Sequence, residues 1–387
     1  MKKLAIVTTH PIQYNAPLFA LLSRRNDFQI KVFYTWGKSV LSSKYDPGFG
    51  KIIDWDINLL DGYEYEFIEN VASNKGSHRF DGIDNPELIT KITSFDPHAI
   101  LVYGWSLKSH FKAMRYFKGR IPVLFRGDSH LLDHQPWVKK TIKRIYLNWV
   151  YKYVDTAFYV GESNYNYYIA SGLHAEQLCY APHAIDNKRF SEITNEIQNQ
   201  TRELKNKFKI SEHDIVFLFA GKFESKKDPM ILLRSFLELK FDSNIHLLLV
   251  GNGELENDLK STASNHHNIH FLDFCNQSEM PAIYHLATVF VLPSKGPGES
   301  WGLSVNEAMA AGKPVIVSDK CGCAASLVNN KKNGLVFTAG DASSLQKALE
   351  YMVNNKNELK SMGDFSSQII SSYSFEHIAA AIAYTLN

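Results

Sequence analysis

The sequence predicts an α/β protein built from two doubly wound, Rossmann-like domains. Two series of short β-rich runs alternate with segments long enough for a helix, which is typical of parallel sheets with helical crossovers. The first series comprises residues 4–8, 29–34, 99–103, 122–125, 156–160 and 178–181. The second comprises residues 215–220, 246–250, 269–272, 289–292, 315–317 and 335–337. A chain of 387 residues is long enough to fold into two such domains.

A polar and charged segment over residues 186–209 separates the two series and has no strand pattern of its own. We place the boundary there, with an N-terminal domain over residues 1–185 and a C-terminal domain over residues 186–374. The amphipathic segment 375–387 follows the second domain and can pack back onto the first. Ligands of doubly wound sheets bind at the carboxyl ends of the strands, so we expect function in a central cleft that both sheets face with these ends.

Composition excludes several classes of protein. The longest apolar runs are about six residues, much shorter than the roughly 20 residues that span a bilayer. The apolar stretch 4–7 behind Lys2 and Lys3 is too short for the core of a signal peptide, which indicates a cytoplasmic protein. Cys321 and Cys323, the only close pair of cysteines, are separated by one residue, so we interpret the cysteines as reduced thiols without a structural zinc. No nucleic-acid partner is expected.

A glycine-rich loop and the helix after it carry two acidic residues. Glu299 lies in the loop, and Glu307 lies about one turn inside a helix that starts near Gly302 and stops at Gly312. Free amides at Gly302 and Leu303 would hold a phosphate without any side-chain charge. In this interpretation Glu299 binds sugar hydroxyls and Glu307 binds ribose hydroxyls. Alternatively, Glu299 only interacts with the helix dipole and Glu307 is a solvated surface residue.

This stretch resembles the signature of family 4 glycosyltransferases: an acid, two residues, a glycine, a second acid eight positions after the first, and then Ala-Met-Ala-Ala-Gly-Lys-Pro-Val. A second match follows the strand 215–220, where Gly221 and Lys222 are followed five positions later by Lys227. It looks like the family's donor-diphosphate element, whose cations face the leaving phosphates. Lysines in a loop are usually a solvated charge run, but these follow a buried-looking strand at its carboxyl end.

Two further strand ends resemble those of the family. Gly253 follows the second strand of this series and Phe274 follows the third, which usually lies near the nucleobase. The family most often has glycine where this chain has Asp273, so the identity of the base stays open. Residues 319–328 and 333–334 complete the resemblance, which covers essentially the whole second domain. It implies the GT-B fold, with the donor bound mainly by this domain.

The first domain resembles the family more loosely. After its fourth strand, Asp128 holds the position where relatives often have a histidine that touches the transferred sugar, with Arg126 before it and His130 after it. Either Asp128 or His130 faces the sugar or the acceptor hydroxyl, or Asp128 merely caps the next segment. The turn after the first strand contains His10, which we assign to the acceptor side. It lacks the Gly-x-Gly-x-x-Gly pattern of an NAD-dependent Rossmann enzyme.

The resemblance implies a retaining, metal-independent glycosyltransferase in which the leaving diphosphate accepts the proton of the acceptor. Lys222, Lys227 and the helix amides would stabilise the departing charge. The nucleotide-diphosphate sugar is then a substrate, and no cofactor is implied. The acceptor would be a saccharide or lipid-linked saccharide in the synthesis of a cell-surface polysaccharide or glycolipid. The alternative is a non-catalytic nucleotide- or carbohydrate-binding protein on the same fold.

One segment of the first domain suggests a membrane partner. Residues 137–153 read as a helix with five basic residues and no acid, interleaved with Trp and Tyr. This composition is typical of a surface that meets anionic lipid headgroups. The alternative is a core-packing helix with buried aromatic rings and solvated lysines. Because the N-terminal domain binds the acceptor in the resembling family, and many such acceptors are lipid-linked, an anionic membrane surface is a candidate partner at the inner face of the membrane.

Overall fold

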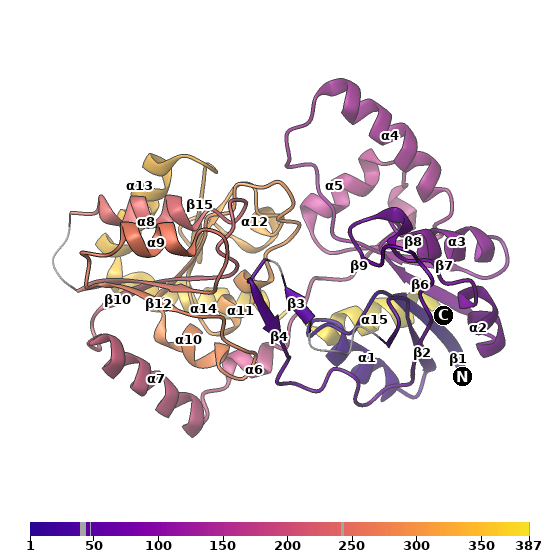
Figure 1. Cartoon of the computed structure of the whole chain (residues 1–387), viewed down its shortest axis with the longest axis horizontal. Coiled ribbons are helices and arrows are strands. Elements are labelled where there is room, and N and C mark those ends of the chain that lie inside the picture. The colour runs from indigo at the N-terminus through magenta and orange to yellow at the C-terminus, as the bar shows by residue number, and fades with distance from the viewer. Residues whose placement is uncertain (39–43, 47, 241–243, 387) are drawn as a thin grey trace. The chain divides into compact units, whose positions relative to one another are not determined.

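The computed structural model describes residues 1–38, 44–46, 48–240 and 244–386, and the chain divides into two compact units (Figure 1). The first unit comprises Met1–Lys44, Asn58–His183 and Phe375–Asn387, and the second comprises Tyr45–Ile57 and Ala184–Ser374. Each unit is built on one parallel sheet with helical crossovers. The predicted α/β class with two Rossmann-like domains is therefore confirmed.

Seven strands form the sheet of the first unit in the order β5-β2-β1-β6-β7-β8-β9, and every neighbouring pair is parallel. The strands are β1 (Lys2–Thr8), β2 (Phe28–Tyr34), β5 (Tyr65–Phe67), β6 (Ala99–Tyr103), β7 (Val123–Arg126), β8 (Thr156–Tyr159) and β9 (Leu178–Tyr180). The helices are α1 (Ala16–Ser23), α2 (Leu88–Phe95), α3 (Lys108–Phe117), α4 (Trp137–Tyr151), α5 (Glu162–Ala170) and α15 (Phe375–Leu386), with short 3₁₀ turns η2 (Phe80–Gly82) and η3 (Ala175–Gln177). The strand order reverses between β1 and β6, which is the switch point of a doubly wound sheet.

Six parallel strands form the sheet of the second unit in the order β12-β11-β10-β13-β14-β15. They are β10 (Ile215–Ala220), β11 (Ile245–Val250), β12 (Ile269–Leu272), β13 (Val289–Leu292), β14 (Val315–Ser318) and β15 (Gly334–Phe337). The helices are α6 (Asn187–Ser191), α7 (Asn195–Phe208), α8 (Pro229–Leu237), α9 (Glu256–Thr262), α10 (Met280–Leu286), α11 (Leu303–Ala310), α12 (Ala324–Leu327), α13 (Ala342–Asn354) and α14 (Leu359–Ile370), with η4 (Lys356–Glu358). All six residues of the apolar strand β10 are buried, as expected for a strand covered on both faces.

The structure differs from the prediction in one stretch of the first 60 residues. The short strands β3 (Lys44–Asp46) and β4 (Lys51–Ile53) form a two-stranded pair, and Tyr45–Ile57 belongs to the second unit although the chain enters it from the first. The second unit otherwise begins at Ala184, two residues from the expected boundary. Helix α15 packs against α1 and β9 in the first unit. None of the helices in the described ranges combines the length and hydropathy that crossing a bilayer requires.

Candidate functional site

An ion pair between a partly buried lysine and a buried glutamate joins two loops at the carboxyl edge of the second sheet. Lys227, in the loop after β10, places Nζ 2.5 Å from Oε2 of Glu299, in the loop after β13. The same oxygen accepts a hydrogen bond of 2.8 Å from the hydroxyl of Ser294. The Glu299 side chain is only 8% exposed. A carboxylate removed from water needs such partners, because burial of an isolated charge is strongly unfavourable.

Helix α11 begins directly behind this loop. Gly302 is its N-cap and has a φ of +100°, which is a left-handed conformation that favours glycine. A Cβ atom at this position would also lie 2.8 Å from Cδ2 of Leu292. Leu303 is the first helical residue, and the first amides of a helix lack intrahelical acceptors and carry the positive end of its dipole. The loop therefore places Glu299 close in sequence to the N-terminus of α11.

Glu307 lies one turn further along α11 and is buried, with 4% of its surface exposed. Its Oε2 accepts a hydrogen bond of 2.7 Å from the Tyr284 hydroxyl, which comes from α10. The interpretation of Glu307 as a solvated surface residue therefore does not fit the structure. The sequence pattern pointed to Glu307 but gave no sign of Tyr284, because the two residues lie on different helices.

The loop after β14 fixes the backbone of the Glu299 loop. The amide of Gly322 donates to the carbonyl of Glu299 at 3.1 Å, and the amide of Cys323 donates to the carbonyl of Trp301 at 3.1 Å. Cys321 and Cys323 are free and buried. Burial raises the pKa of Cys321 to about 12, so its thiol is neutral at physiological pH. These cysteines pack the loop.

Close backbone approach shapes the neighbouring strand ends. A Cβ atom on Gly251 would lie 2.0 Å from the carbonyl oxygen of Gly221, and one on Gly253 would lie 2.6 Å from the carbonyl oxygen of Phe223. Only glycine fits these two positions, so the loops after β10 and β11 pack backbone against backbone. This packing fixes the chain at Lys222, which directly follows Gly221.

Lys222 contacts a segment from the N-terminal part of the chain. Its Nζ lies 4.9 Å from the ring centroid of Phe49, a cation–π distance. The backbone of Gly48 runs so close that a Cβ atom there would lie 2.7 Å from Cδ of Lys222. The two lysines predicted for the diphosphate thus follow the same strand but have different partners: Lys227 pairs with Glu299.

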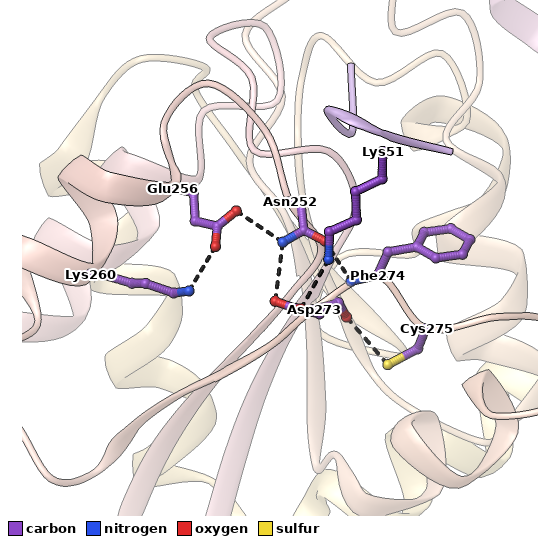
Figure 2. A network of polar contacts seen from close by, with 7 residues as sticks. All are labelled: Lys51, Asn252, Glu256, Lys260, Asp273, Phe274 and Cys275. Carbon is purple, nitrogen blue, oxygen red and sulfur yellow. Dashed lines mark hydrogen bonds and ion pairs between the residues drawn. The ribbon is translucent and has the colours of Figure 1, made fainter. Parts of the chain in front are cut away.

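A polar network links the same segment to the ends of β11 and β12 (Figure 2). Lys51 in β4 places Nζ 2.9 Å from Oδ2 of Asp273. Asn252 donates to the other Asp273 oxygen at 3.1 Å and accepts from the amide of Phe274 at 2.8 Å. The hydrogen bond from Lys51, followed by that from Asn252, lowers the pKa of Asp273. Sequence reasoning missed Lys51, because a three-residue strand far away in the chain gives no signal of this contact.

Asp128 in the first unit lies near a residue that the sequence analysis did not select. Its Oδ2 is 3.9 Å from Nε2 of His183, which follows β9 as Asp128 follows β7. Burial lowers the pKa of His183 to about 4, although Asp128 opposes this effect. The imidazole is therefore neutral at pH 7. Helix α4 begins at Trp137 with Pro136 at its N-cap, so Asp128 does not cap that helix.

The other residues predicted for the acceptor side have local partners. Arg126 is buried and donates to the carbonyls of Ala181 at 2.9 Å and Pro182 at 2.8 Å. His130 accepts a hydrogen bond of 3.1 Å at Nδ1 from the amide two residues later. The Nδ1 of His10 lies 2.8 Å from the hydroxyl of the preceding threonine. Arg126 thereby holds the chain after β9 in place.

A sequence model of the glycosyl transferases group 1 family matches residues 200–368, which include Lys222, Lys227, Glu299 and Glu307. These residues, less than half of the 387 in the chain, are similar to the family. The match lies within the second unit, where the ion pair and the N-terminus of α11 are found. The predicted resemblance to family 4 glycosyltransferases is thus confirmed.

Curated relatives of this group 1 glycosyl transferase align over less than half of their length. Phosphatidyl-myo-inositol mannosyltransferase of Mycobacterium leprae is 32% identical over 141 residues, which are 36% of this chain and 37% of the relative. UDP-Gal:alpha-D-GlcNAc-diphosphoundecaprenol alpha-1,3-galactosyltransferase of Escherichia coli is 28% identical over 183 residues, 45% of each protein. Among solved structures, HepE of Anabaena in complex with UDP and glucose has a TM-score of 0.71 at 16% identity, covering 100% of this chain and 99% of HepE. The chain therefore has the GT-B fold.

Proposed function

We propose that this group 1 glycosyl transferase moves a sugar from a nucleotide-diphosphate donor to a saccharide or lipid-linked saccharide, with retention of the anomeric configuration. The observation that carries the proposal is the pair of Lys227 and Glu299 in the loop that leads into α11. Lys227 and the first amides of α11 suit a diphosphate, and the Glu299 carboxylate suits sugar hydroxyls. These are the chemical parts of a sugar diphosphate.

The chemistry follows from these roles. The acceptor hydroxyl forms a bond to the anomeric carbon as the bond from that carbon to the diphosphate oxygen breaks, and its proton passes to the departing diphosphate. Lys222 and Lys227 stabilise the negative charge that develops on the leaving group. Glu307, held by Tyr284, receives the ribose hydroxyls of the donor. The carboxylates of Glu299 and Glu307 act as hydroxyl ligands, so neither is required to form a covalent intermediate.

The relatives suggest which substrates to test first. The name of the E. coli relative specifies UDP-galactose as donor, and HepE binds UDP. The same E. coli name specifies a diphosphoundecaprenol-linked sugar as acceptor, and the M. leprae name specifies phosphatidyl-myo-inositol. We infer that a UDP-sugar is the leading donor candidate and that the acceptor carries a lipid, in polysaccharide or glycolipid biosynthesis.

Thermal shift with UDP-, GDP- and ADP-sugars tests donor binding. A donor at 100 times its Kd stabilises the folded chain by about 2.7 kcal/mol, so the matching nucleotide stands out from the others. The release of nucleoside diphosphate in the presence of lipid-linked acceptors then tests turnover. Binding without acceptor-dependent release would favour the non-catalytic alternative. If no nucleotide sugar changed the melting temperature, the donor site itself would be wrong.

We also propose that α4 contacts an anionic membrane surface. The helix exposes one apolar stripe at helical spacing: Val138 (48% exposed), Ile142 (64%), Ile145 (68%) and Trp149 (40%). Four cations flank the stripe: Lys139, Lys140, Lys143 and Arg144. The core-packing alternative fits only its C-terminal part, where Leu147, Val150 and Tyr151 are buried. An apolar stripe flanked by cations matches the interface of a bilayer with anionic headgroups.

Sedimentation with vesicles tests this contact. We expect the chain to pellet with phosphatidylglycerol vesicles, to pellet less with phosphatidylcholine vesicles, and to dissociate as salt rises. The double variant Ile142→Ser and Ile145→Ser should lose most of this binding. Ile193→Ser, which changes an equally apolar side chain that is 56% exposed in the second unit, is the matched control. Equal pelleting with both lipids, or none with either, would leave α4 as a solvated helix.

A further inference from the structure

Lys51, Asp54 and Asp56 hold the segment 48–56 against the residues that follow β12. Lys51 pairs with Asp273 at 2.9 Å, as Figure 2 shows. Five residues later, the carboxylate of Asp56 accepts hydrogen bonds from the amide of Ser278 at 3.0 Å and from its hydroxyl. Between these points, the carbonyl of Asp54 accepts from the Asn276 side chain at 2.7 Å. Asp54 and Asp56 have the Asp-x-Asp spacing of a metal motif, but in this structure the carboxylate of Asp56 accepts hydrogen bonds from Ser278.

Asn252 connects the Lys51–Asp273 pair to the ends of β11 and β12. Its side-chain nitrogen donates to Asp273 at 3.1 Å and to Glu256 at 2.9 Å, while its oxygen accepts from the amide of Phe274 at 2.8 Å. Asn252 is 3% exposed. These three hydrogen bonds fix the orientation of the Asn252 side chain. Asn252 in turn fixes the Asp273 carboxylate in the position where it binds Lys51.

The segment places an aromatic ring between two residues of the predicted donor site. The ring of Phe49 lies 4.9 Å from Nζ of Lys222 and, edge to face, 4.9 Å from the ring centroid of Phe274. The ring centroid of Trp55 lies 6.2 Å from that of Phe274. Lys222 follows β10 and Phe274 follows β12, so Phe49 bridges the carboxyl edge where ligands of such sheets bind.

We propose that segment 48–56 is a built-in wall of the donor site and that Phe49 is a positioning residue for Lys222. Phe49 holds the ammonium group where the diphosphate leaves, and together with Phe274 and Trp55 it forms the aromatic surface against which the nucleobase packs. The Lys51–Asp273 pair keeps the wall in place. This inference rests on the proposed donor function of the second unit.

The proposal gives Asp273 a role in the donor site. In this structure the Asp273 carboxylate is the partner of both Lys51 and Asn252. Asp273 therefore acts on the nucleobase side through the segment that it fastens, rather than by contact with the base.

Calorimetric titration of the full chain with UDP, GDP and ADP tests the wall. The unmodified chain must bind one of them, and failure here would refute the donor function rather than the wall. Phe49→Ala should weaken that binding about tenfold, because an aromatic contact and a cation–π contact are lost. Lys51→Ala should weaken it about threefold, as expected for a partly exposed ion pair. The charge exchange Lys51→Asp with Asp273→Lys should restore binding to within about twofold.

Matched variants separate positioning from general stability. Lys205→Ala removes an ion pair of similar length, 2.8 Å to Glu212, before the amino end of β10, and should leave nucleotide affinity unchanged. Phe49→Tyr keeps the aromatic ring and should keep the nucleotide affinity. Phe49→Leu keeps an apolar side chain without the ring and should lose that affinity. In turnover assays the donor KM should rise while the acceptor KM stays constant. Unchanged affinity in Phe49→Ala and Lys51→Ala would overturn the proposal, and so would tighter binding, which would make the segment an obstacle.

Discussion

The carboxyl edges of the two sheets bury polar groups of different kinds. In the second unit, the buried Glu299 forms an ion pair with Lys227, whose side chain is 19% exposed. In the first unit, the buried Arg126 donates to backbone carbonyls instead of a carboxylate, and His110 is fully buried between neutral groups. Its Nδ1 lies 2.9 Å from the carbonyl of Tyr103, and its Nε2 lies 2.9 Å from the hydroxyl of Thr35. A carbonyl only accepts, so Nδ1 donates and Nε2 accepts. A buried ion pair contributes less stability than apolar packing, whereas a satisfied neutral group fixes a fold. The ion pair of the second edge fits the proposed donor site, whereas His110 of the first edge fits a structural role.

The largest effect is expected when the ion pair of the second unit is broken. Lys227→Ala should lower kcat/KM for the donor by roughly 30-fold to 1,000-fold, about 2–4 kcal/mol, because a cation next to the leaving diphosphate is lost. Lys222→Ala should lower it by at least about tenfold for the same reason. Steady-state kinetics with the donor found by thermal shift provide the measurement.

The neighbouring lysine gives the control for this experiment. Lys226 is 43% exposed at its side chain and pairs with Glu224 at 3.3 Å. Lys226→Ala should change kcat/KM by less than about twofold, as expected for a surface pair. Undiminished turnover in both Lys227→Ala and Lys222→Ala would contradict the role of these lysines at the diphosphate. It would also contradict the functional difference between the carboxyl edges of the two sheets.

In the first unit, the buried His110 should affect the stability of the fold at acidic pH rather than the rate of sugar transfer. Burial lowers the pKa of His110 to about 4, below the ordinary value of 6.5. Between these values the unfolded chain binds more protons than the folded chain, so the stabilisation present above pH 6.5 is lost as the pH falls towards 4. The loss amounts to about 3 kcal/mol at most. Urea unfolding at pH 7, 5.5 and 4 measures it.

A non-titrating amide isolates the contribution of His110. His110→Gln should be less stable than the unmodified chain at pH 7, and this difference should shrink as the pH approaches 4. His134→Gln changes an exposed histidine and should leave the curve unchanged. A constant difference between pH 7 and pH 4 would show that His110 is not held neutral by burial.

A smaller effect should separate the two acids of the second unit. Glu307→Ala should weaken nucleoside diphosphate binding by about tenfold to 100-fold, because a charge-assisted hydrogen-bond acceptor for ribose is lost. Glu299→Ala should chiefly lower the rate of sugar transfer and leave this binding nearly intact. Calorimetry with the nucleoside diphosphate alone distinguishes them. The reverse result would exchange the two roles.

Hydrophobic patterning predicted most of the fold because parallel strands buried on both faces are continuous apolar runs. Strands β6, β10, β12 and β13 have the predicted bounds, and the other core strands differ by one or two residues. The three-residue strands β3, β4 and β5 escaped prediction, since so few residues show no periodicity. Their place depends on contacts with distant parts of the chain.

The candidate site was predictable where one local motif contains its parts. Glu299, Gly302 and Glu307 lie within nine residues, and the structure places all three around one helix start. The partners Tyr284 and Lys51 come from elsewhere, and no spacing rule connects them to the motif. The first unit was harder, because a position two residues after a strand does not determine where a side chain points.

The smallest effect concerns Asp128, which tests whether the first unit contributes to transfer at all. The side chain is 43% exposed and lies 3.9 Å from His183, whose imidazole is neutral at pH 7 because burial lowers its pKa to about 4. The partly exposed carboxylate follows β7 at the carboxyl edge of the first sheet, where we expect it to contact an acceptor hydroxyl. Asp128→Asn should therefore raise the acceptor KM or lower kcat by about threefold to tenfold, up to about 1.4 kcal/mol, with nucleotide affinity unchanged. Asp96→Asn, an exposed position at the end of α2, is the control and should match the unmodified chain. If Asp128→Asn instead weakened nucleotide binding, Asp128 would belong to the donor site, and the division of roles between the two edges would fail.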